Sequence, residues 1–156
     1  MEMKKIILAL FIIGIIAVSI SSVSAGEKVT VKDYTFELPD DANITQEKDD
    51  LVSFEATEGM KGFIGYIDYE ELYSFTKNDT DYVVESMNSS PQTYYFIDRS
   101  MQIWGYFMTF NTNGHNYIFE VYNNETLDTS PSEEKMNMTL QEIIDFYDKN
   151  PTINSV

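Results

Sequence analysis

Apolar and polar residues alternate most regularly in the middle of the chain. This alternation predicts three strands, over residues 93–97, 102–110 and 116–122. Residues 111–114, between the last two strands, predict a hairpin turn in which Gly114 adopts the positive φ that such turns require. We therefore expect the centre of the fold to be an antiparallel sheet.

The longest of these segments is apolar on both faces. Trp104, Tyr106 and Phe110 alternate onto one face, and Ile103 and Phe107 alternate onto the other. A sheet with one face in water shows apolar residues on the opposite face only. The pattern therefore predicts that helix covers at least part of the second face of the sheet.

Shorter apolar runs before this block predict further strands. Residues 28–38 alternate and indicate a strand pair or one kinked strand, which ends at Pro39. Residues 51–56 and 63–67 follow as short strands. The loop 58–62 between them contains two glycines, which suits a hairpin.

One helix is predicted in the middle of the chain, over residues 68–90. Asp68 is a suitable N-cap, and the run ends near Ser90. A restart at Asp79 or Thr80 would extend the helix through the apolar residues that follow.

The last segment, residues 130–150, has the most complete set of helix signals. Ser130 is the predicted N-cap, Pro131 takes the first helical position and Glu133 completes a capping box. Asn150 precedes a proline and ends the helix. One apolar stripe at helical spacing consists of Met136, Leu140, Ile143, Ile144 and Tyr147.

The order of these elements predicts the fold class. Strands are followed by a helix, three strands and a second helix, without an internal repeat and without the alternation of strands and helices that parallel sheets need. We expect an α+β fold, in which a mainly antiparallel sheet of about six strands is packed against the middle helix and the C-terminal helix.

Residues 1–25 have the pattern of a signal peptide. Two lysines precede an apolar run over residues 6–18, and a Ser-rich tail follows. We predict cleavage between Ala25 and Gly26. Residues 6–25 carry no charge and, at about 1.5 Å per residue, would just cross a bilayer core as a helix. An uncleaved N-terminal membrane anchor is therefore the alternative.

Residues 26–156 have the length of a single extracytoplasmic domain with one core. They contain 25 Asp and Glu but only eight Lys and Arg, a formal charge of −17. Nucleic acid is effectively excluded as a partner, because phosphate binding needs clustered cations, and anionic lipid surfaces are disfavoured for the same reason. The chain has no cysteine, which removes lipoprotein attachment and cysteine-based zinc sites. We predict no cofactor and no metal.

Aromatic side chains form the first candidate binding site. Tyr94, Tyr95, Trp104 and Tyr106 would stack on sugar rings or on a peptide if they formed an exposed row. The simpler interpretation places them in the core and at the helix–sheet interface, where aromatic pairs stabilise a sheet.

Five Asn-x-Ser/Thr sequons follow the predicted cleavage site. Each is a candidate for a surface glycan in a host that modifies such sites. The candidates are Asn43, Asn78, Asn88, Asn124 and Asn137.

Titratable residues give no clear catalytic pattern. His115 is the only histidine and follows Gly114 at the predicted turn, so we interpret it as a solvent-exposed turn residue. The clustered acidic residues raise the question of a calcium site. No loop has the spacing that a calcium site needs, so we interpret these residues as solvated surface. A pair of catalytic carboxylates stays open, because acids are so abundant that some pair will always lie at a suitable distance.

Three stretches carry a resemblance to known proteins. They are residues 3–8, residues 29–39, and a block in which Tyr106-Phe107 is followed by Gly114 and by Tyr117-Ile118-Phe119. These stretches look like small exported proteins of unknown function from methanogenic archaea, and the order of elements is similar to that of PsbP/Mog1-like domains. The resemblance implies an archaeal source, an antiparallel sheet flanked by helices and an accessory or binding role, with no catalytic residues to transfer.

We therefore expect an exported, non-catalytic binding or accessory module that is secreted or associated with the cell envelope. Its partner would be an envelope glycan or protein. The alternative is a small exported hydrolase that cleaves cell-wall glycan or peptide through two carboxylates. A deep pocket with two carboxyl groups and a raised pKa on one of them would favour the hydrolase, and a flat aromatic patch would favour the binding module.

Overall fold

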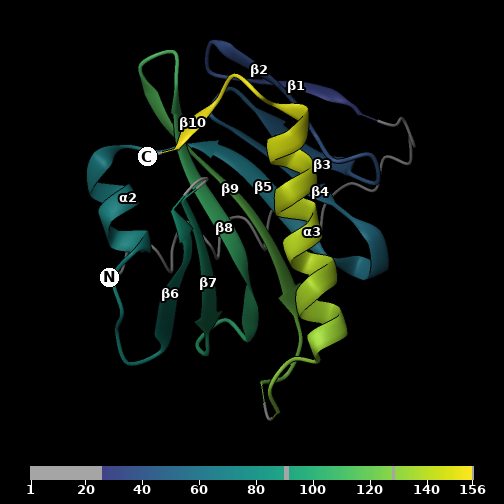
Figure 1. Cartoon of the computed structure of the whole chain (residues 1–156), viewed down its shortest axis with the longest axis vertical. Helices are drawn as coiled ribbons and strands as arrows, with labels where there is room; N and C mark the ends of the chain where they lie inside the picture. The colour runs from purple at the N-terminus through teal and green to yellow at the C-terminus, as the bar shows by residue number, and fades with distance from the viewer. Residues whose placement is uncertain (1–25, 90–91, 128, 156) are drawn as a thin grey trace.

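The computed structural model describes residues 26–89, 92–127 and 129–155 (Figure 1). The predicted signal peptide, including Ala25 of the predicted cleavage site, lies outside the described residues. The helices are η1 (Thr57–Gly59), α2 (Tyr69–Phe75) and α3 (Glu133–Lys149). The strands are β1 (Lys28–Val31), β2 (Tyr34–Glu37), β3 (Asn43–Lys48), β4 (Leu51–Glu55), β5 (Lys61–Tyr66), β6 (Tyr82–Ser89), β7 (Gln92–Asp98), β8 (Ile103–Thr112), β9 (His115–Asn124) and β10 (Asn154–Ser155). None of the described helices is long and apolar enough to span a bilayer.

Seven strands form the main sheet, in the order β3-β4-β5-β9-β8-β7-β6. All neighbours in this order are antiparallel. The strand β10 pairs with the end of β8, and β1 pairs with β2 in a separate hairpin. The predicted α+β class and the mainly antiparallel sheet are confirmed, with seven strands in the sheet instead of about six.

The three strands predicted from the alternating pattern are present as β7, β8 and β9. Strands β8 and β9 remain paired up to Thr112 opposite His115, so Asn113 and Gly114 alone form the turn. Both turn residues have positive φ, 52° and 77°, which is the geometry that two-residue hairpins favour. The predicted hairpin is confirmed, with a tighter turn than the four residues expected.

Helix α3 packs across one face of the sheet, over β8 and β9, and we call this the first face (Figure 1). Phe146 of α3 stacks on Phe119 of β9, with ring centroids 3.9 Å apart and ring planes 6° apart. Phe36 of β2 also lies against Phe146, so the β1–β2 hairpin contributes to the same core. From β8 this core includes Trp104, Tyr106, Met108 and Phe110, all at most 2% exposed.

The opposite face, which we call the second face, holds a separate apolar cluster. Leu72 and Phe75 of α2 belong to this cluster together with Phe107 of β8, and the rings of Phe75 and Phe107 lie 6.0 Å apart. The prediction that helix covers part of the second face is therefore confirmed. The cover is small, because α2 has seven residues and α3 has 17.

The middle helix is much shorter than the predicted span of residues 68–90. Asp68 caps α2 as expected, since its carboxylate accepts from the backbone N–H of Glu71 and completes a capping box. The helix then ends at Phe75. The predicted end near Ser90 lies outside the described residues.

Strand β6 replaces the second half of that predicted helix. The Asp79 carboxylate accepts from the backbone N–H groups of Asp81 and Tyr82, which fixes a turn where a helix restart was expected. Tyr82, Val83 and Val84 then pair with β7, and aromatic and β-branched residues favour such positions. The predicted restart is wrong because pairing with a neighbouring strand outweighs a weak helical pattern.

Strand β3 was not predicted from the sequence. Its residues, Asn43–Lys48, are polar except for Ile44 and show no apolar alternation. Within the described residues it pairs with β4 alone, at one edge of the sheet, and a bulge lies between Ile44 and Gln46. An edge strand buries few side chains, so no alternating pattern is needed to form it.

Helix α3 begins later than predicted. Its N-cap is Ser132, whose hydroxyl accepts from a backbone N–H of the first turn, while Ser130 and Pro131 precede the helix. The predicted apolar stripe is also corrected. Ile144 is 42% exposed, and Phe146 occupies the buried position instead.

Candidate functional site

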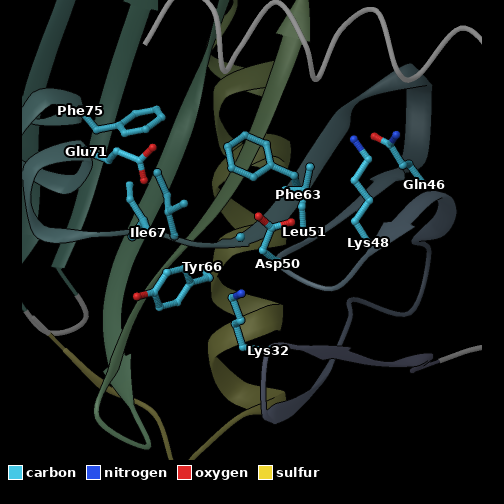
Figure 2. Close-up of a pocket in the computed structure, with 12 residues that line it drawn as sticks. Lys32, Gln46, Lys48, Asp50, Leu51, Phe63, Tyr66, Ile67, Glu71 and Phe75 are labelled. Carbon is cyan, nitrogen blue, oxygen red and sulfur yellow. The ribbon is translucent and has the colours of Figure 1, made fainter. Parts of the chain in front are cut away.

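A groove of about 370 Å³ lies on the second face of the sheet, beside α2 (Figure 2). Its floor follows one cross-strand row, in which Gly65 of β5 pairs with Leu51 of β4 and with Ile118 of β9. Gly65 has no side chain, so the row is hollow between two apolar residues. A Cβ atom added there would lie 3.3 Å from Cδ1 of Leu51. This is a tight contact, so Leu51 leans over Gly65, and a side chain at this position would have to displace Leu51 or extend into the groove.

The walls of the groove are apolar. Phe63 and Ile67 flank Gly65 along the chain, and Phe75 reaches the groove from α2. These three large side chains are at most 3% exposed. Pockets of roughly 300–1,000 Å³ with mainly apolar walls and a few polar groups are the usual form of ligand sites. The size and the lining of this groove fall within that description.

The rim of the groove carries charges of both signs at separate positions. Figure 2 shows Lys48 and Gln46 together at one end of the groove. Glu71 lies at the other end, next to Phe75, and Phe63 lies between the two ends. The carboxylate of Asp50 also lies between the two ends, so the groove carries a cation at one end and carboxylates in the middle and at the other end.

The side chains at the two ends retain hydrogen-bonding capacity. Among the described residues, Lys48 makes no ion pair and the side chain of Gln46 makes no hydrogen bond. The Oε2 atom of Glu71 accepts from the backbone N–H of Asp68 at 3.3 Å, as part of the α2 capping box. The other carboxylate oxygen of Glu71 is available to a ligand.

A second cation, Lys32, also lines the groove. Its Nζ is 3.2 Å from Oδ2 of Asp49 and 5.3 Å from the centre of the Tyr66 ring. Both contacts hold Lys32 in place and partly neutralise it. Lys48 is therefore the rim cation that is best placed to meet a charged ligand.

The four aromatic residues predicted as a binding patch do not form one surface. Trp104 and Tyr106 are 0% and 2% exposed in the core of the first face. Tyr95 packs on both, with ring centroids 6.4 Å and 5.3 Å away. Tyr94 lies on the second face, where its ring stacks on Phe107. The simpler interpretation, which places these residues in the core, holds for Trp104 and Tyr106, and no exposed row forms because neighbouring residues of a strand point to opposite faces and the first face is covered.

Two buried carboxyl groups have raised pKa values, and neither lines the groove. Burial, together with the negative charge of Asp98, raises the pKa of Glu120 well above its ordinary value. Burial and a hydrogen bond with Asp41 raise the pKa of Glu142 to about 8. Burial opposes ionisation of Asp41, but hydrogen bonds from Glu142 and Thr57 outweigh it and lower the pKa of Asp41.

The predicted glycosylation sites are distributed over the surface. Asn78, Asn124 and Asn137 are exposed, and Asn43 is half-buried at the start of β3. Asn88 belongs to β6, and its side chain is outside the described part of the structure. These positions are compatible with glycans, and glycosylation stays a prediction.

His115 follows the β8–β9 turn and its side chain is 41% exposed. Its Nε2 atom is 3.7 Å from Oδ2 of Asp33, and its ring meets Tyr66 edge-on with centroids 5.5 Å apart. Tyr66 lines the groove, so His115 supports the rim from behind without lining the cavity.

Sequence reasoning identified none of the groove residues as a site. One signal was present, because Gly65 interrupts an apolar strand, and a glycine inside a strand often marks a place where a side chain must be absent. The two charged ends come from β3, which was not predicted, and from α2. Only the fold brings Lys48 and Glu71 to one cavity.

The described residues contain no group of three or more His, Cys, Asp or Glu side chains that would hold a metal ion. No family model and no curated protein matches this chain. The functional argument therefore rests on the groove and on the sequence pattern.

Proposed function

We propose that this protein is an exported, non-catalytic binding module that acts at the cell envelope and holds its ligand in the groove of the second face. The observation that carries this proposal is a cavity of about 370 Å³ with an apolar floor at Gly65 and a charged rim. The signal-peptide pattern of residues 1–25 supports a place outside the cytoplasm. The resemblance to small exported archaeal proteins supports an accessory role.

The alternative, a carboxylate-dependent hydrolase, has weaker support. Glu142 and Glu120 have raised pKa values, but neither lines the groove. Glu142 also shares a hydrogen bond with Asp41, whereas the two carboxyl groups of a glycosidase are separated by about 5 Å or more. Binding is the function that the geometry supports best.

Obstruction of the groove tests the proposal. Gly65→Val places a branched side chain in the hollow, and valine suits a central strand. We expect the neutral apolar dye Nile red to bind the wild-type protein saturably and the Val variant at least tenfold more weakly. Gly65→Ala, which adds a single methyl group, is the matched control and should stay within about threefold of wild type.

Two further measurements keep this test decisive. Thermal unfolding of each variant separates loss of the groove from loss of the fold. Leu51→Trp obstructs the same hollow from β4, where the native side chain is only partly buried. Unchanged Nile red affinity in a folded Val or Trp variant would overturn the proposal.

Export is tested on the natural protein by cell fractionation and intact mass. A mass that corresponds to residues 26–156, with or without attached sugar, in the medium or the envelope would support export and cleavage. A full-length, unmodified chain in the membrane fraction would contradict the cleavage and glycosylation predictions and would indicate an anchored domain.

A further inference from the structure

The polarity of the groove constrains the chemistry of its ligand. One end offers the ammonium of Lys48 and the amide of Gln46, and the other end offers the carboxylate of Glu71 (Figure 2). Apolar surface and the carboxylate of Asp50 lie between them. A ligand that satisfies the whole groove must be anionic at one end and cationic at the other end, and its middle must be mainly apolar with a hydrogen-bond donor for Asp50.

The Lys48 end suits a carboxylate. An ammonium and a side-chain amide both donate hydrogen bonds, and bonds between charged groups are about twice as strong as neutral ones. Three other lysines already form ion pairs with acidic side chains. These pairs are Lys32 with Asp49, Lys135 with Glu125 and Lys149 with Asp40.

The Glu71 end suits an ammonium group. Figure 2 shows the carboxylate of Glu71 pointing from α2 into the groove, beside the ring of Phe75. Its position in the first turn of α2 is fixed by the capping box with Asp68. A purely anionic amphiphile would leave this carboxylate facing an apolar chain, and an unpaired charge beside apolar matter is costly.

We propose that the groove binds a short zwitterionic peptide with apolar side chains. This inference rests on the proposed binding function. The carboxylate of the peptide meets Lys48 and Gln46, its amino group meets Glu71, and an apolar side chain fills the hollow above Gly65. Because both termini are recognised, the ligand is a free short peptide and not an internal segment of a larger protein.

A set of leucine peptides provides the test. Dileucine, trileucine and tetraleucine span different lengths with the same chemistry, and calorimetry should show one preferred length. For the preferred peptide, N-acetylation or C-amidation removes one terminal charge and leaves the apolar part unchanged. We expect each modification to weaken binding at least fivefold.

Matched variants assign each end of the peptide to one residue. Glu71→Gln removes the charge but keeps a side chain that completes a capping box, and Lys48→Met keeps the apolar stem of lysine. The penalty for N-acetylation should disappear in Glu71→Gln, and the penalty for C-amidation should disappear in Lys48→Met. This coupling is the signature of direct contact.

The outcomes separate this inference from the proposed function. If Nile red binds the groove but no leucine peptide binds, or if both terminal modifications are neutral, the peptide inference is wrong and the binding function stands. Binding of decanoate that depends on Lys48 and exceeds that of every peptide would also overturn the inference, in favour of an anionic amphiphile. If neither dye nor peptide binds, both proposals fail.

Discussion

The two faces of the sheet are built from the same strands but differ in how completely helices cover them. On the first face, α3 covers β8 and β9 with a continuous aromatic core (Figure 1). On the second face, the seven-residue α2 covers less, and a groove is left beside it. The buried oxygens of Ser53, Glu120 and Tyr122 have no hydrogen-bond partner among the described residues, and all three belong to strands of this sheet.

The contrast is visible within single strands. Phe119 of β9 stacks under α3, and the next residue, Glu120, pairs in register with Phe63 beside the groove. Buried polar groups without partners and unfilled space both reduce stability. The first face therefore supplies the stability that allows the second face to keep an imperfectly filled surface.

Removal of the buried ring of Phe146 from α3 tests the first face and carries the largest expected effect. Phe146 is 0% exposed and stacks on Phe119, so Phe146→Ala should lower the free energy of unfolding by about 3–5 kcal/mol. Urea unfolding measures the change. Ile144→Ala, at the exposed neighbouring position, is the control and should cost well under about 1 kcal/mol.

A milder variant at the same position, Phe146→Leu, sharpens the comparison between the faces. If the faces are separate in function, folded Phe146→Leu protein should bind Nile red within about twofold of wild type. A loss of less than about 1 kcal/mol in Phe146→Ala would contradict the assignment of the first face as the stabilising one.

The first face was largely predictable from the sequence, and the reason is physical. Alternation in β8 and β9 and helical spacing in α3 both reflect burial against a regular partner, which leaves a periodic pattern. Trp104 and Tyr106 belong to that pattern and proved to be core residues. The sequence predicts Ser130 as the N-cap of α3, whereas the observed N-cap is Ser132. Both serines fit the local signals of a helix start.

The second face was not predictable to the same extent. The groove depends on a missing side chain at Gly65, on Lys48 from a polar edge strand and on Glu71 from a short helix. None of these leaves a periodic signal. Strand β6 was missed because residues 68–90 carry a weak helical pattern, which does not register the pairing of β6 with the next strand, β7.

A buried carboxyl at the edge of the first face gives the next prediction, which concerns pH. The pKa of Glu142 is raised from 4.5 to about 8, first by burial and then by Asp41. Between these values the unfolded chain has released the proton and the native protein keeps it, so stability falls as the pH rises through this window. Glu142→Gln should remove this decline, whose slope for one proton is at most about 1.4 kcal/mol per pH unit before solvent screening.

Urea unfolding at about pH 5 and at about pH 8 measures the decline. The wild-type protein should lose more stability between these two conditions than Glu142→Gln does. Glu134→Gln changes an exposed acid of the same helix and should behave as wild type. The lowered pKa of Asp41 does not interfere, because the stability that it contributes is lost only as the pH falls below about its ordinary value of 3.8. An identical pH dependence in wild type and Glu142→Gln would contradict the raised pKa of Glu142.

The smallest expected effect concerns His115, which contacts the groove residue Tyr66. Its ring contacts Tyr66 from behind the groove and its side chain is 41% exposed, so few contacts are lost on truncation. His115→Ala should change the free energy of unfolding by less than about 0.5 kcal/mol, as surface substitutions usually do. Peptide and Nile red affinities, measured by calorimetry and fluorescence, should stay within about twofold of wild type.

Tyr66→Ala removes a groove residue on the same side and should weaken binding more. A loss of binding or activity beyond about tenfold in His115→Ala would show that the functional surface extends past the groove to the β8–β9 turn. A residue that only supports Tyr66 from behind does not touch the ligand, so its truncation cannot cause a loss of that size.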